Sequence, residues 1–61
     1  MSEQHKAQAY GELLNEHTRV GNRINEIKGQ NIELSKEQQR QVELLQKKQI
    51  EIMENIKRLF N

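Results

Sequence analysis

The sequence contains no cysteine, no proline and no tryptophan, and its only aromatic residues are Tyr10 and Phe60. Without cysteine the chain cannot form disulfides, which small domains often use to supplement a small core. Apolar residues never run longer than two in succession, whereas a membrane-spanning helix needs about 18 or more. These absences exclude a disulfide-stabilised module and a membrane span. The lack of cysteine also favours an intracellular, cytoplasmic location.

Charge of either sign is not in excess, since ten Lys and Arg residues balance nine Asp and Glu residues. The isoelectric point is about 8.1, and a domain that binds nucleic acid typically has a concentrated basic surface and a value above about 9. The charges therefore serve solubility, and nucleic acid is not an expected partner.

Groups for catalysis and metal binding are also scarce. His5 and His17 are too far apart in sequence to share a metal through the i, i+4 spacing on one helix face. No cysteine, and no serine in a pattern with histidine and an acid, supports nucleophilic catalysis. Gly11, Gly21 and Gly29 are scattered and form no phosphate loop. We expect no enzymatic activity, no catalytic residue, no metal or other cofactor and no small-molecule substrate.

The sequence is rich in helix-forming residues arranged in one long periodic stripe. Steps of three and four residues continue from Tyr10 to Leu59, and a 3.5-residue phase held this long is typical of a coiled coil. The predicted core and interface residues are Tyr10, Leu13, Val20, Ile24, Ile27, Leu34, Val42, Leu45, Ile52, Ile56 and Leu59. The predicted polar layers, expected to fix register and oligomer number, are His17, Asn31, Gln38 and Gln49.

The phase shifts once, near residues 34–42, where the two steps Leu34–Gln38 and Gln38–Val42 are both of four residues. Such a stutter locally unwinds a supercoil without ending the helix. The leading prediction is therefore an all-α chain, a single segment over residues 1–61. It would be one long amphipathic helix of roughly 80 Å that assembles into a coiled coil or helical bundle.

The number of helices in that bundle follows from the width of the stripe. Leu14, Met53 and Phe60 stand beside the core positions and widen the apolar face, so that it can touch more than one neighbouring helix. We therefore favour three or four helices over a two-stranded coiled coil.

An alternative interpretation breaks the helix at residues 29–35. Gly29 could cap a first helix, and Ser35 followed by Gln38 could form a capping box that begins a second one. The result would be a hairpin with helices over 3–28 and 36–60, and two such hairpins would make a four-helix bundle.

Two functions remain open at this point. The first is a non-enzymatic structural module that oligomerises or tethers partners, through self-association or partner helices. The second is a compact hairpin regulator that binds a protein target or a structured RNA. Its RNA contacts would be Arg40, Lys47, Lys48, Lys57 and Arg58.

Overall fold

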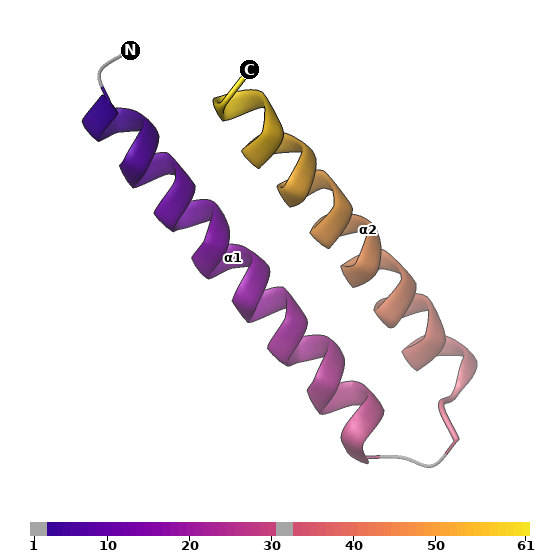
Figure 1. The fold of residues 1–61 in the computed structure, drawn as a ribbon. Helices are drawn as coiled ribbons and strands as arrows, with labels where there is room; N and C mark the ends of the chain where they lie inside the picture. Colours follow the sequence, from indigo (N-terminus) through magenta and orange to yellow (C-terminus); the bar gives the residue numbers. More distant parts are fainter. Residues whose placement is uncertain (1–2, 31–32) are drawn as a thin grey trace.

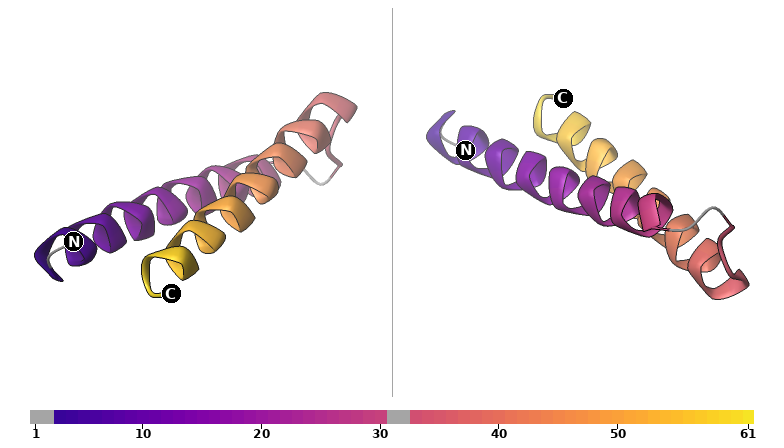
Figure 2. Two further views of the ribbon diagram at one scale, coloured as in Figure 1. Left: turned by 90° about the horizontal axis from the view of Figure 1, so that it is seen from above. Right: turned by 90° about the horizontal axis from the view of Figure 1, so that it is seen from below.

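The computed structural model describes residues 3–30 and 33–61, which form two α-helices, α1 (Glu3–Gln30) and α2 (Lys36–Leu59). The helices run antiparallel and pack along their length, so the start of α1 and the end of α2 lie at the same end (Figure 1). Views from above and below show that the two axes cross at a shallow angle (Figure 2). The molecule is an elongated helical hairpin.

The core lies in the seam between the two helices. Leu13, Leu34 and Leu45 are partly buried against a cluster of six buried side chains, and all nine belong to the stripe that the sequence predicts. The six are Val20, Ile24, Ile27, Val42, Ile52 and Ile56. With six buried side chains among the described residues, this hairpin has a small core. Burial of one aliphatic side chain stabilises the folded state by roughly 1.5–3 kcal/mol.

The start of α2 is fixed by the capping box predicted from Ser35 and Gln38, and the prediction is confirmed. The backbone N–H of Gln38 donates to the Ser35 hydroxyl at 3.1 Å, and the backbone N–H of Ser35 donates to the Gln38 side-chain oxygen at 2.9 Å. Ser35 has extended backbone angles, with φ −65° and ψ 165°. The chain therefore enters α2 from a non-helical residue whose own donor is satisfied.

The prediction of one continuous helix is wrong. The structure has two separate helices, Glu3–Gln30 and Lys36–Leu59, and the largest extent of the hairpin is 47 Å. Folding back lets the two halves of the stripe cover each other within one molecule. The two adjoining steps of four reflect the helix boundary, because Leu34 precedes α2 and Gln38 lies in its first turn. The predicted stutter is therefore absent from these residues.

The hairpin interpretation matches the observed architecture, except for its cap at Gly29. This residue lies inside α1, and none of the described glycines has a positive φ. The last turn of α1 instead carries Lys28, a charge that favours the negative end of the helix dipole. In the described residues two helices, α1 and α2, pack against each other, so the expected count of three or four helices per bundle is not supported within one molecule.

Candidate interaction surface

The hairpin has two broad faces, one on each side of the plane that contains the helix axes. We call them face A and face B, and define them from helical spacing and from the contacts below. Face A comprises Tyr10, Leu14, His17 and Gly21 of α1, Gln46, Ile50 and Met53 of α2, and Phe60, the C-cap residue that follows α2. Face B comprises Glu12, Glu16, Arg19 and Arg23 of α1, and Gln41, Leu44 and Lys48 of α2.

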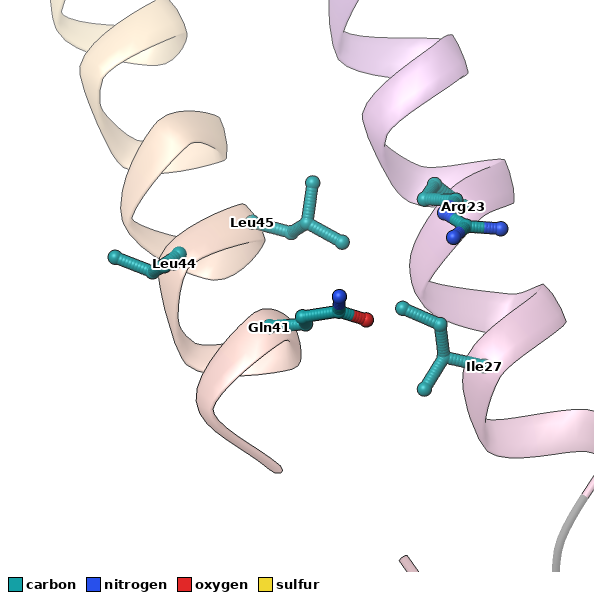
Figure 3. A pocket seen from close by; sticks show the side chains of 5 residues that line it. All are labelled: Arg23, Ile27, Gln41, Leu44 and Leu45. Atoms are coloured by element: carbon teal, nitrogen blue, oxygen red, sulfur yellow. The ribbon is translucent and has the colours of Figure 1, made fainter. Parts of the chain in front are cut away.

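Face B is the charged side of the hairpin. Lys48 Nζ lies 3.5 Å from Glu16 Oε1 and joins the two helices, while Arg23 pairs with Glu26 within α1 at 3.2 Å. Between Arg23 and Ile27 on α1 and Gln41 and Leu45 on α2 the surface forms a shallow depression, in which Gln41 points toward Ile27 (Figure 3). The two ion pairs, Lys48–Glu16 and Arg23–Glu26, are solvent-exposed and contribute little stability.

Leu44 borders this depression but is directed away from α1 (Figure 3). Its exposed fraction is 60%. A single exposed leucine is normal on a protein surface, and it has charged and amide neighbours on this side.

Face A, in contrast, exposes several large apolar side chains together. Ile50 and Phe60 are 60% and 61% exposed, and Met53 and Leu14 are 43% and 39% exposed. Ile50 and Met53 also line a depression of about 550 Å³ with His17 of α1. Clustered exposed apolar groups mark an interaction site more often than scattered ones do.

Tyr10 lies at the open end of this face and not in the core. The sequence predicts it as a core residue, but it is 38% exposed. Its ring packs edge-on against Phe60 with a centroid separation of 5.5 Å and an interplanar angle of 78°. Leu59, the last predicted core residue, is half-buried.

The predicted polar layers have different environments. His17 and Gln49 are half-buried and line the same depression on face A. Gln38 differs from its predicted role, because its side-chain oxygen accepts the capping hydrogen bond from Ser35. Asn31 lies outside the described residues, so its predicted layer is not placed.

The smallest residues of α1 have different surroundings on this side. A Cβ atom built on Gly21 would lie 3.3 Å from Gln49 Nε2 of α2, whereas one built on Gly11 would meet nothing within 4 Å. The middle of α1 presents uncharged and small groups toward face A, among them Leu14, Thr18 and Gly21. Its four charged residues between Ala7 and Asn25 all project toward face B; they are Glu12, Glu16, Arg19 and Arg23.

Sequence reasoning noticed three of the exposed apolar residues but missed Ile50. Leu14, Met53 and Phe60 each follow an apolar residue of the predicted core, and the sequence therefore predicts that they widen the apolar face. Ile50 follows Gln49, which is one of the predicted polar layers, so the apolar pattern does not reveal its place beside the stripe. Extending the same test to every residue that follows a core position would have found it.

The basic residues proposed as RNA contacts do not form one surface. Lys48 lies on face B beside Glu16, and Lys57 lines the depression on face A with Glu54. Arg40 lies in a third depression with Lys36 and Glu37. Acidic groups are thus interspersed with the basic ones.

Metal-binding and membrane-spanning features were also sought over residues 3–30 and 33–61. No group of three or more His, Asp or Glu side chains in this range could hold a metal ion. Neither α1 nor α2 is long and apolar enough to cross a membrane.

Comparison of the chain with protein-family models, with curated proteins and with solved structures gave no significant match.

Proposed function

We propose that this chain is a non-enzymatic interaction module, a helical hairpin that joins further helices through face A and thereby oligomerises or tethers molecules. The observation that carries the proposal is the exposed apolar group on that face, formed by Leu14, Ile50, Met53 and Phe60. A second layer of helices would bury it.

Energetics supports the same conclusion. A chain of 61 residues without disulfide or metal has few ways to offset its conformational entropy, and added helix-to-helix burial is one of them. The seam between α1 and α2 buries six apolar side chains, while face A leaves others in water. A partner that covers face A would bury the apolar side chains that the hairpin alone leaves exposed to water.

The mixed charges on the outer surfaces argue against structured RNA as the main partner. A nucleic-acid surface gains affinity from clustered Lys and Arg. Here Lys48 is paired with Glu16, and Lys57 shares its depression with Glu54. A helical partner remains the better proposal.

The test compares two residues of similar size and equal exposure on the same helix. Ile50 on face A and Leu44 near face B are each 60% exposed. We expect the melting temperature of the parent chain to rise with protein concentration, because folding and association are coupled. Ile50→Lys should abolish this rise, while Leu44→Lys should retain it.

The measurements are thermal melts by circular dichroism over a concentration series, together with the mass in solution by light scattering. A monomeric mass with a melting temperature independent of concentration would contradict self-association. Equal effects of the two lysine substitutions would contradict the assignment of the contact to face A.

A further inference from the structure

A second row of residues runs beside the core on each helix. It consists of the residue that follows each core-facing position, about 100° farther round the helix. We call it the docking row. On α1 it contains Gly11, Leu14, Thr18, Gly21, Asn25 and Lys28. On α2 it contains Glu43, Gln46, Ile50, Met53 and Lys57, and it ends at Phe60, the C-cap residue of this helix.

The two halves of the docking row have complementary sizes at matching intervals. Gly11 and Gly21 are ten residues apart on α1, and Ile50 of α2 is ten residues from Phe60, the C-cap residue of that helix. Either interval spans about 15 Å along a helix. Two small positions on one helix are therefore spaced like two large apolar positions on the other.

The register inside the hairpin brings these positions to the same level. Gly21 lies beside Gln49, with its added Cβ 3.3 Å from the amide nitrogen, so it is level with the adjacent Ile50. Tyr10 contacts Phe60, so Gly11 is level with Phe60. Each glycine thus lies at the same level along the hairpin as one large apolar residue. Within one molecule, however, the glycine and that apolar residue lie side by side on face A, and the apolar side chain does not cover the glycine.

We infer that a second copy of this chain covers face A, related to the first by a two-fold axis parallel to the helices. The inference rests on the proposed function and specifies its partner and geometry. Such an axis keeps every residue at its own level and places α1 of each protomer against α2 of the other. Gly21 then receives the partner's Ile50, and Gly11 receives the partner's Phe60.

The remaining positions of the docking row match in the same arrangement. Thr18 lies opposite the partner's Met53, and Asn25 lies opposite the partner's Gln46. At the end near the turn, Lys28 meets the partner's Glu43, a pair of opposite charges. At the other end, Leu14 meets the aliphatic part of the partner's Lys57, whose ammonium group can reach solvent.

The other two-fold arrangement, with its axis across the helices, fits the face less well. It stacks α1 on α1 and α2 on α2, so that small residues lie on small ones and large residues on large ones. The spacing between the layers would then be uneven. A two-fold interface requires a self-complementary patch, and only the parallel axis pairs the large side chains with the glycines.

The size of face A also fits a dimer. The Cα atoms of the hairpin extend over 47 by 16 Å along its two longer axes, so the rectangle that encloses a broad face has a projected area on the order of 750 Å². A stable protein–protein interface buries about 800 Å² on each partner. One further copy is therefore enough to cover the face, and the product is an antiparallel four-helix bundle.

Single-cysteine variants test the inference directly, because the natural chain contains no cysteine. Thr18→Cys and Met53→Cys chains are mixed, refolded together and oxidised mildly. A disulfide requires Cα atoms within about 7 Å, so we expect the mixed 18–53 disulfide to exceed either homodisulfide roughly ten-fold, well above the two-fold statistical excess. Leu44→Cys in place of Met53→Cys is the matched control and should give no such excess.

A second pair, Asn25→Cys with Gln46→Cys, repeats the test at another level of the bundle and guards against a variant that fails to fold. Circular dichroism and light scattering establish helicity and mass before oxidation. A dimeric mass with dominant 18–18 or 53–53 disulfides overturns the arrangement but leaves the proposed function standing. A monomeric mass at every concentration, with only statistical cross-linking, overturns both.

Discussion

Faces A and B are built from the same two helices, yet they carry opposite chemistry. Face B has the Glu16–Lys48 ion pair and the charged residues of α1, whereas face A has exposed Ile50, Met53 and Phe60 beside uncharged small residues. A hairpin that functions alone needs one apolar sector on each helix, and this sector faces the other helix of the same hairpin. The additional exposed apolar group on face A, which lies beside Glu54 and Lys57, is expected of a hairpin that contacts a second layer of helices.

The largest effect should come from the core that supports both faces. Ile52 is 3% exposed and Ile50 is 60% exposed, so they form a matched pair on one helix. Ile52→Ala should reduce the free energy of unfolding by about 2–5 kcal/mol, because it leaves a cavity. The measurement is urea denaturation followed by circular dichroism, at a concentration low enough to favour monomer. In that state Ile50→Ala should cost far less, and equal costs would contradict the placement of Ile52 in the seam.

A smaller effect should follow from loss of the capping box that begins α2. Ser35→Ala removes the hydroxyl that accepts from Gln38 and should cost about 0.5–2 kcal/mol. The same denaturation experiment applies, with Gln41→Ala, an exposed change one turn farther into α2, as the control. If the control costs as much as the cap variant, the capping box has no special role.

A still smaller effect should separate the glycines. A Cβ added at Gly11 or at Gly29 meets nothing within 4 Å in the hairpin. Gly11→Ala should therefore stabilise the monomer by about 0.5–1 kcal/mol through helix propensity. Gly29→Ala, near the end of α1, should stabilise it by no more than this.

Concentration then distinguishes the two positions. At high concentration the gain at Gly11 should shrink, because the partner's Phe60 occupies that space, while the gain at Gly29 should persist. Melts at two concentrations measure both changes. A gain at Gly11 that does not depend on concentration would contradict the proposed packing.

The smallest effect belongs to face B. Glu16→Gln breaks the ion pair with Lys48. Because the side chains of Glu16 and Lys48 are 39% and 55% exposed, solvent screens the pair, and the free energy of unfolding should fall by under about 1 kcal/mol. Its cost should fall further at high salt, and the mass in solution should remain that of the parent. A change of oligomeric state in this variant would indicate that face B also takes part in assembly.

Much of the fold could be predicted from local pattern. The stripe of apolar residues predicted which side chains line the seam, because heptad spacing depends only on helix geometry. Ser35 and Gln38 predicted the start of α2, since both capping hydrogen bonds are local. Neither signal required knowledge of distant parts of the chain.

The continuous helix was wrong because periodicity cannot tell whether the facing stripe belongs to another molecule or to the same one. Leu34 kept the phase across the break and appeared to be helical. In the structure it precedes α2 and packs partly buried against the core, so an apolar residue in the turn can imitate a helical layer. Face A could be predicted only in part, because the importance of Ile50 depends on which side of the seam it occupies.

The capping box and the short turn also bear on how fast the chain folds. The segment between α1 and α2 is short, and closing a loop of about ten residues takes only about 10–100 ns. Helical proteins dominated by local contacts fold in microseconds to milliseconds, and a chain without proline has no slow prolyl isomerisation to await. In the proposed dimer, the encounter of two hairpins would then be the step whose rate falls with dilution. Assembly kinetics, and not formation of the helices, would set the response time of this module.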